Sequence, residues 1–449
     1  MVSEWREVTV DQIRASSDYS LATGPFGSSI GSKYFQKSGV PVIRGSNLSE
    51  QVGTRLLEDD LVFLSLEKAA QFRRSIVRPG DLVFTCWGTV GQVGIIDERS
   101  RFKEYVISNK QMKLTPDPCQ ADSLFLYYCF SGPELSSLIK QQAIGSSVPG
   151  FNLGQLKAIR LSIPPLDEQH AIARLLGSLD DKIYLNGQTN RTLHEMGRTL
   201  FGSWFVEFDP VVARAAGRTP FGITARVAPL FPTEFVESDK GPVPQGWHSV
   251  PFSALVNILS GGTPKTSVPD YWSGDIPWFS VVDTPGPGDV FVVDTQRKIT
   301  QRGLNESAAE LLEEGTTIIT ARGTVGNVAV VGTPMAINQS CYGLTGKSGL
   351  GPYFVYYATL EALEDLLQRT HGSVFSTITK MTFDSVALVE PPTEIAQAFE
   401  EEVGRLLQRI KASLEESRTL AELRDFLLPR LLSGEIQSHR AEKLLEQAI

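Results

Sequence analysis

An internal repeat limits the folds open to this chain more than any other feature. Three matches, each given with its second copy, are Gly88-Thr89-Val90-Gly91 with Gly323-Thr324-Val325-Gly326, Tyr127-Tyr128 with Tyr356-Tyr357, and Pro164-Pro165 with Pro391-Pro392. The copies lie 235 residues apart at the glycine turn (323 − 88) and 227 apart at the proline pair (391 − 164). Repeats of solenoid proteins are only ~20–50 residues long. The sequence therefore predicts two globular heads rather than a solenoid.

Each head is followed by about forty residues with an apolar side chain at every third or fourth position, which predicts a long amphipathic helix. Such a helix is roughly 60 Å long and too polar to be stable alone, so we expect two antiparallel helices packed on each other. The predicted fold class is mixed α+β, with two tandem globular domains separated by a pseudo-two-fold pair of coiled-coil helices. The predicted segments are 1–165 (first head), 166–208 (first helix), 209–246 (connector), 247–392 (second head), 393–435 (second helix) and 436–449 (C-terminal tail).

Within the heads, alternating and helical patterns predict the same order of elements twice. In the first head we expect strands at 81–85 and 92–96, a helix over 124–142 and a last strand at 158–163. In the second head we expect strands at 316–320, 328–331 and 385–390, and a helix over 353–369.

Two asparagines, Asn186 and Asn190, fall on the apolar seam of the first long helix. A polar residue in a seam of this kind usually fixes register and partner at some cost in stability. The alternative is a break in the helix beside Gly187.

Composition is that of an ordinary soluble protein, and the predicted location is the cytoplasm. The four cysteines have no metal-binding or redox spacing, the N-terminus does not resemble a secretory signal, and no apolar run is long enough to span a membrane. Net charge is −9. Residues 1–166 carry 18 basic and 16 acidic side chains (+2), whereas residues 241–392 carry 8 and 14 (−6). A chain this acidic that binds DNA is expected to borrow positive charge from a partner subunit.

Patterns typical of catalysis are absent from the sequence. Asp180-Asp181-Lys182 resembles part of a nuclease site, but it falls in the first long helix, where a solvated helix face is the simpler interpretation. The five histidines make no metal-binding spacing. The sequence predicts a non-catalytic chain with no metal or cofactor of its own.

The copies agree at their turns and differ at their loop tips, which favours two readers of different base edges on one scaffold. Neutral drift in surface loops after duplication is the alternative. Asn109-Lys110-Gln111 stands near Asn338-Gln339-Ser340 in this comparison. The candidate DNA-binding residues of the first head are Lys33, Arg44, Ser46, Asn47, Trp87, Thr89, Lys110, Gln111, Ser146 and Ser147. Those of the second head are Lys265, Thr266, Arg322, Thr324, Asn338, Gln339, Ser373, Ser376 and Thr377.

The chain resembles the specificity subunit of Type I restriction–modification systems along its full length. The segments that carry the resemblance are Pro164-Pro165-Leu166-Asp167-Glu168-Gln169, Phe205-Val206-Glu207-Phe208-Asp209-Pro210, Gly241-Pro242-Val243-Pro244-Gln245-Gly246-Trp247 and Leu427-Leu428-Pro429-Arg430-Leu431-Leu432-Ser433-Gly434. One departure is Pro391-Pro392-Thr393-Glu394-Ile395, where the second helix does not repeat the Leu-Asp-Glu-Gln start.

The resemblance implies that each head is a target-recognition domain that reads one half of a bipartite, asymmetric site in double-stranded DNA. The helices would set the unread spacer and dock two modification subunits, which bind S-adenosylmethionine and methylate adenine. Restriction subunits would add translocation and cleavage with ATP and Mg²⁺. Two alternatives remain: a DNA-binding regulator that works alone, and a coiled-coil adaptor with two protein-binding heads.

Overall fold

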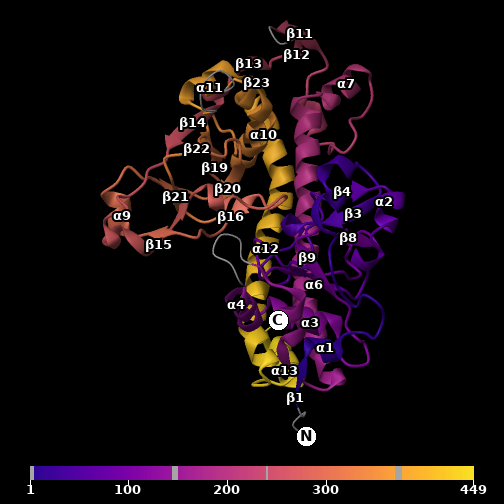
Figure 1. Cartoon of the computed structure of the whole chain (residues 1–449). Coiled ribbons are helices and arrows are strands. Elements are labelled where there is room, and N and C mark those ends of the chain that lie inside the picture. The colour runs from indigo at the N-terminus through magenta and orange to yellow at the C-terminus, as the bar shows by residue number, and fades with distance from the viewer. Residues whose placement is uncertain (1–4, 144–149, 239–240, 370–376, 449) are drawn as a thin grey trace. The chain divides into compact units, whose positions relative to one another are not determined.

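The computed structural model describes residues 5–143, 150–238, 241–369 and 377–448. The chain forms two compact units: unit 1 consists of residues 1–182 and 419–449, and unit 2 of residues 183–418. Two helices of 40 residues, α6 (Leu166–Phe205) and α12 (Thr393–Leu432), each contribute one part to unit 1 and the other part to unit 2 (Figure 1). Each compact unit therefore contains one head and a section of both long helices.

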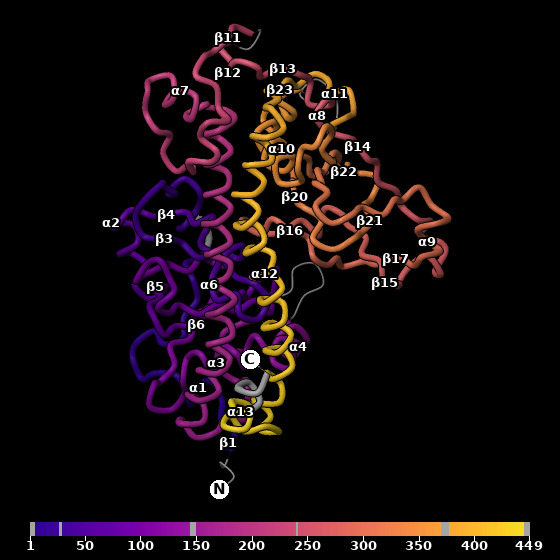
Figure 2. Tube along the Cα trace, turned by 180° about the vertical axis from the view of Figure 1, so that it is seen from behind, coloured from indigo at the N-terminus to yellow at the C-terminus, as the bar shows by residue number. Residues whose placement is uncertain are grey.

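The helices are antiparallel within each unit, as predicted. In unit 1, Asp180 of α6 contacts Arg424 of α12, and Glu168, near the start of α6, contacts Ser438, which follows α12. In unit 2, Asn186 contacts Ser413, whereas Phe205 at the end of α6 contacts Phe399 near the start of α12. Later residues of one helix thus meet earlier residues of the other. Figure 2 shows the two helices from behind.

The first head contains two four-stranded sheets and a strand pair that joins its ends. One sheet has the order β2-β9-β6-β7: Leu21–Thr23, Gln111–Leu114, Leu82–Thr85 and Val93–Ile95. The other has the order β4-β3-β8-β5: Val62–Leu64, Val40–Ile43, Tyr105–Ile107 and Ile76–Val77. The joining pair is β1 (Arg6–Thr9) with β10 (Arg160–Ile163), and the remaining helices of unit 1 longer than four residues are α2 (Leu66–Ala70), α3 (Ser123–Ser131), α4 (Pro133–Gln142), α5 (Leu153–Ala158) and α13 (Ser438–Ala448).

The second head repeats this arrangement with one additional strand and with three strands, β14, β15 and β22, that are longer than any described in the first head. A five-stranded sheet has the order β14-β22-β19-β20-β16: Val256–Ser260, Cys341–Gly346, Thr317–Thr320, Val328–Val331 and Phe291–Val292. A four-stranded sheet has the order β17-β15-β21-β18: Lys298–Ile299, Trp272–Phe279, Met335–Ile337 and Leu311–Leu312. The joining pair is β13 (His248–Pro251) with β23 (Ala387–Glu390), and the helices are α8 (Phe252–Leu255), α9 (Gln301–Asn305), α10 (Pro352–Gln368) and α11 (Lys380–Ser385).

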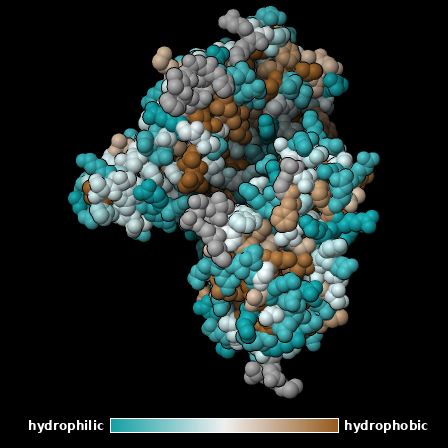
Figure 3. Space-filling view, viewed as in Figure 1, coloured by the Kyte–Doolittle hydropathy of each residue, from teal (hydrophilic) through white to brown (hydrophobic). Residues whose placement is uncertain are grey.

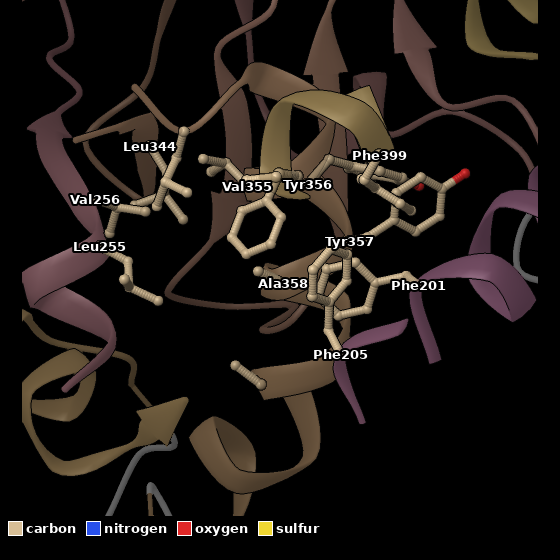
Figure 4. Packing of buried hydrophobic residues seen from close by; sticks show 14 of the residues in the cluster. Phe201, Phe205, Leu255, Val256, Leu344, Val355, Tyr356, Tyr357, Ala358 and Phe399 are labelled. Atoms are coloured by element: carbon tan, nitrogen blue, oxygen red, sulfur yellow. The ribbon is translucent and has the colours of Figure 1, made fainter. Parts of the chain in front are cut away.

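Aromatic side chains join the second head to the long helices. Phe201 and Phe205 of α6, Tyr357 of α10 and Phe399 of α12 meet in one buried cluster (Figure 4). Their ring centroids lie 5.2 Å apart for Phe205–Phe399 and 5.6 Å for Phe201–Phe399, in edge-to-face geometry. Aromatic pairs in this geometry contribute about 0.5–1.5 kcal/mol beyond the burial of their area. The head is therefore packed on the helices as part of one core.

Farther from this core, the region around α9 has a mainly hydrophilic surface (Figure 3). Arg302 there pairs with both Asp270 and Glu306. The surface of this part of the second head thus carries exposed ion pairs around Arg302.

One expectation about local structure is wrong, and two segments contain elements that the sequence did not predict. The helix expected over 124–142 is two helices, α3 and α4, because Pro133 has no N–H to donate and disfavours a helical conformation at Gly132. The connector contains α7 (Asp209–Ala215) and the hairpin of β11 (Phe235–Ser238) with β12 (Gly241–Pro244). The C-terminal tail contains α13, whose Ala441 is fully buried in the core of unit 1.

The observed bounds of the two long helices are close to the predicted ones. The possible break beside Gly187 does not occur, since α6 is continuous from residue 166 to residue 205. Helix α6 ends three residues earlier than expected, before Phe208, whose φ of 55° is left-handed. Helix α12 likewise ends at Leu432, shortly before Gly434 with φ of 75°. At both ends a residue with left-handed backbone conformation follows the helix, and this conformation does not continue a right-handed α-helix.

Candidate nucleic-acid interface

Three turns meet at one edge of the first head, and we call them its tip loops: residues 44–48, 86–92 and 108–111. Strand β6 ends at Thr85, and Cys86 donates its N–H to the Lys110 carbonyl at 2.7 Å. Gln92 donates to the Leu48 carbonyl at 2.9 Å, which joins the second turn to the first. A Cβ built on Gly45 would lie 3.8 Å from both Thr89 Oγ1 and Gln111 Nε2. The three turns therefore form one continuous surface.

The second head has tip loops of the same construction, at residues 280–284, 321–327 and 338–341. Ala321 donates its N–H to the Ser340 carbonyl at 2.7 Å, as Cys86 does to Lys110. Asn327 donates to Thr284 Oγ1 at 3.1 Å, in the place where Gln92 donates to Leu48. In both heads the first residue after the strand donates its N–H to a side chain three residues later. After β3, Arg44 donates to Asn47 at 2.9 Å, and after β15, Ser280 donates to Asp283 at 2.8 Å.

A close backbone approach confirms the equivalence. Gly24 donates its N–H to the Gln111 carbonyl, and Gly261 donates to the Cys341 carbonyl. A Cβ at Gly24 would lie 1.8 Å from the Ser108 carbonyl oxygen, and one at Gly261 would lie 1.9 Å from that of Asn338. Only glycine fits at either position.

These contacts define the alignment of the third tip loop. Thr85 pairs with Gln111 in β9, and its equivalent Thr320 pairs with Cys341 in β22. Ser108 therefore corresponds to Asn338, and Lys110 to Ser340, so Asn109 corresponds to Gln339. The sequence comparison counts along the chain, whereas the register of the turn is set by strand pairing.

Most of the candidate DNA-binding residues lie at the surface. The exposed ones are Lys33, Ser46, Trp87, Thr89, Lys110, Lys265, Thr266, Arg322, Thr324 and Gln339, and the partly exposed ones are Arg44, Asn338 and Thr377. Ser146, Ser147, Ser373 and Ser376 lie outside the described residues. The tip loops bring together Ser46, Trp87, Thr89 and Lys110 in one head and Arg322, Thr324 and Gln339 in the other. Lys33, in the 3-10 helix η2 (Ser32–Tyr34), and Lys265 and Thr266 lie outside the tip loops.

Two candidates are buried and support the loops instead. Asn47 is 1% exposed, and its amide group donates to the Leu57 carbonyl at 2.9 Å. Gln111 is fully buried; in the orientation that satisfies both ends of its amide, it donates to the Ile43 carbonyl at 3.3 Å and accepts from the Gly45 N–H at 3.1 Å. The structure therefore corrects the expectation for both, since neither side chain reaches the surface. Arg44 is also engaged, because its guanidinium donates to the Asp60 carbonyl at 2.7 Å.

The sequence comparison missed several exposed residues on these surfaces. Asn109, at the tip of its turn, is exposed, and so is Val282, with 64% of its surface accessible. Phe26, in the loop that follows Gly24, is 74% exposed. Their place in the chain was the signal that the sequence offered. Phe26 lies two residues after Gly24, and Val282 lies two residues after Ser280, and the backbone N–H groups of Gly24 and Ser280 are both hydrogen-bonded.

The tip loops contain no reactive thiol. Burial raises the pKa of the Cys86 thiol to about 11 and that of the Cys341 thiol to about 12. Both therefore stay protonated at neutral pH. Nor does the described part of the chain bring three or more His, Cys, Asp or Glu side chains together as a metal site.

Away from the tip loops, the helix pair carries polar groups in its seam. Asn186 is 3% exposed and donates to Glu416 Oε2 at 2.8 Å and Ser417 Oγ at 3.1 Å. Asn190 is 1% exposed and donates to Asp289 Oδ1 at 3.1 Å. The partners of Asn186 lie on α12, so a shift of register between the helices would leave its buried amide unpaired, whereas Asp289 belongs to the second head and ties Asn190 to that head.

Asp180 was expected to lie on a solvated helix face, and this is wrong. It is 2% exposed, and its carboxylate accepts from Arg424 at 2.8 Å and from the Tyr128 hydroxyl. Asp181, the next residue, keeps 62% of its side chain exposed. A buried carboxylate held by an arginine of the neighbouring helix is a structural ion pair, not a nuclease site.

Among the described residues, no helix is long and apolar enough to cross a bilayer.

The sequence of this chain is similar to those of known proteins. The type I restriction modification DNA specificity domain family matches residues 28–195 and 244–424, one match in each half of the chain. The specificity subunit of the type I restriction enzyme HindI from Haemophilus influenzae is 28% identical over 377 residues, which cover 74% of this chain and 81% of the relative. The putative MjaX specificity subunit from Methanocaldococcus jannaschii is 22% identical over 417 residues, covering 89% and 88%.

A solved structure supports the predicted fold class. The type I restriction–modification S subunit from M. genitalium superposes with a TM-score of 0.57 and 16% sequence identity, over 96% of both chains. Two tandem mixed α/β domains with long helices are therefore confirmed as the fold. The chain belongs to the type I restriction–modification DNA specificity family, and its predicted role as a specificity subunit rather than an enzyme is confirmed.

Proposed function

We propose that each head reads one half of a bipartite, asymmetric site in double-stranded DNA. The observation that carries this proposal is the pair of equivalent tip loops, which have the same backbone hydrogen bonds but different exposed side chains. A shared backbone presents its tips to DNA in the same way in both heads. Different side chains at those tips then select different bases.

The long helices, in this proposal, set the spacer between half-sites and dock two modification subunits. Leu185 and Met196 of α6 support the docking role, because 59% and 52% of their surfaces are exposed. They are separated by eleven residues, about three helical turns, so they share one face of the helix. S-adenosylmethionine, ATP and Mg²⁺ belong to the modification and restriction subunits. The net charge of −9 fits this division, since positive charge for the DNA backbone would come from those subunits.

Co-expression with the cognate modification subunit, followed by mapping of methylated adenines in the host DNA, tests this function. We expect methylation only at a two-part motif with a fixed gap. Replacing residues 1–165 with the corresponding head of a relative should change one half of the motif and leave the other half and the gap unchanged. If both halves change, the two heads are not independent readers.

Salt-dependent binding to a DNA duplex separates the alternatives. The proposed subunit binds specifically only with modification subunits present. A regulator that works alone would bind its site unaided, and a protein-binding adaptor would bind no specific duplex in either condition.

A further inference from the structure

One exposed position is held identically in the two heads and carries opposite chemistry. Trp87 directly follows Cys86 and Arg322 directly follows Ala321, the residues whose N–H groups are fixed to the third tip loop. The carbonyls of these two residues are fixed as well: Cys86 accepts from Phe151 at 2.9 Å, and Ala321 accepts from Ile378 at 3.0 Å. The glycine turns that follow are also the same, with positive φ at Gly88 and Gly91 and at Gly323 and Gly326.

A second residue also differs between the heads at corresponding places: Gly150 in the first and Thr377 in the second. Gly150 pairs with Trp87 through a β-bridge, and a Cβ built on Gly150 would lie 2.5 Å from the indole ring. Glycine is therefore required under the tryptophan. In the second head the corresponding residue, immediately before Ile378, is Thr377. Trp87 and Gly150 in the first head thus correspond to Arg322 and Thr377 in the second, and both residues differ between the heads.

The charge of the second head makes Arg322 distinctive. Among its tip loops, residues 280–284, 321–327 and 338–341, Arg322 is the one cationic side chain, and residues 241–392 carry a net charge of −6. Arg322 is exposed, and within the described parts of the chain no hydrogen bond or ion pair engages its guanidinium. In the first head, by contrast, Trp87 exposes 49% of a large apolar ring at the equivalent point.

We propose that residues 87 and 322 are the equivalent specificity-determining positions of the two heads, each reading one base pair of its half-site. The inference rests on the proposed DNA-reading function. Arg322 donates its two parallel N–H groups to N7 and O6 of a guanine in the major groove, the pairing that a guanidinium fork matches best. Trp87 has no comparable donor pair and presents an apolar face, which favours contact with the methyl group of a thymine.

An exchange of these corresponding pairs tests the proposal in the complete complex with modification subunits. In the first variant, Arg322→Trp is combined with Thr377→Gly, so that the tryptophan has room. We expect methylation of sites with guanine at the read position of the second half-site to fall by about ten- to a hundredfold relative to other bases, with a gain at thymine. The first half-site and the spacer should stay unchanged. The reciprocal variant, Trp87→Arg with Gly150→Thr, should alter only the first half-site.

Two single variants keep the test open if an exchange variant fails to fold. Arg322→Lys retains the charge but not the fork, so guanine preference should relax while methylation persists. Arg322→Ala should also relax it. As a control, Arg218→Ala removes an exposed arginine of the connector and should leave the motif unchanged.

Retention of the same base preference in the second half-site by methylation-competent Arg322 variants would overturn the proposal, and so would a change confined to the first half-site. The wild-type complex distinguishes this outcome from failure of the proposed function. If the wild type methylates no two-part motif, the function itself is wrong; if it does and only the variants are silent on base choice, the assignment of residue 322 is wrong.

Discussion

Arg424 and Asp180 show how the two copies of the repeat fill one space with different chemistry. At the offset of 227 residues, Asp180 corresponds to Leu407 and Arg424 to Gly197, and the matching tyrosines Tyr128 and Tyr357 lie 229 residues apart (357 − 128). In unit 1 the tyrosine donates to the buried Asp180–Arg424 pair. In unit 2, Leu407 is fully buried and the tyrosine occupies the space beside Gly197, where a Cβ would lie 2.1 Å from its hydroxyl oxygen.

Removal of the buried carboxylate should destabilise unit 1 strongly. Asp180→Ala leaves the Arg424 guanidinium, with 6% of its side chain exposed, paired with the exposed Asp425 but without the buried carboxylate of Asp180. Breaking a buried ion pair in this way costs about 3–5 kcal/mol. We expect faster amide hydrogen exchange in α3 and in the first turns of α6.

The neighbouring residue provides the control. Asp181→Ala removes an exposed carboxylate, for which a loss within about 1 kcal/mol is expected. Equal effects of the two substitutions would show that burial of the Asp180 pair contributes nothing.

At the scale of elements, the helices and strands followed from local patterns, whereas their partners did not. The proline pairs and the three-to-four spacing were sufficient to predict α6 and α12, because helix patterns are local. The break between α3 and α4 depends on one proline, and the burial of α13 depends on contacts with residues far away in sequence. Register in the third tip loop was likewise set by strand pairing across the sheet, which an alignment of two loops does not contain.

Helix α6 has two apolar side chains on one face, Leu185 and Met196, that the fold of the single chain leaves exposed. Leu185→Lys combined with Met196→Lys should reduce co-purification of the modification subunit at least tenfold. The two substitutions remove apolar contacts that contribute about 2 kcal/mol or more to binding, and they place two charges in the interface. Helix content measured by circular dichroism should be unchanged. Gln188→Lys with Thr199→Lys adds the same charge to the same helix without removing an apolar side chain and should have a smaller effect. Full binding by the first variant would place the docking surface elsewhere.

For the molecule as a whole, the sequence was sufficient to predict two heads and two helices, and the exposed loop tips as places to look for DNA contacts. It was not sufficient to separate loop tips from loop supports. Asn47 and Gln111 have the amide chemistry of base readers, but tertiary contacts bury both. Asp180 looked like a surface residue because its partner Arg424 is 244 residues away.

Matched insertions in both long helices test their role as a spacer. Seven residues added after Lys182 in α6 and seven after Arg418 in α12 would lengthen each helix by about 10 Å and keep the apolar stripe close to its original face. We expect the gap of the methylated motif to grow by up to about three base pairs, at about 3.4 Å each, with both half-sites unchanged. The same insertion in α6 alone should abolish methylation, because Asn186 would lose its partners on α12. An unchanged gap with the matched insertions would contradict the spacer role.

The discontinuity of unit 1 has a consequence for synthesis on the ribosome. Its core includes Leu427, Leu428, Leu431 and Ala441, which are translated only after all of residues 183–418. At about 5–20 residues per second, that interval is roughly 10–50 s. During this time the nascent first head has an unfilled apolar face around Ile172 and Leu176, and unit 2 is complete before that face is covered. Chaperone binding to ribosome-bound chains should therefore concentrate on the first-made part of the protein, which is the last to be completed.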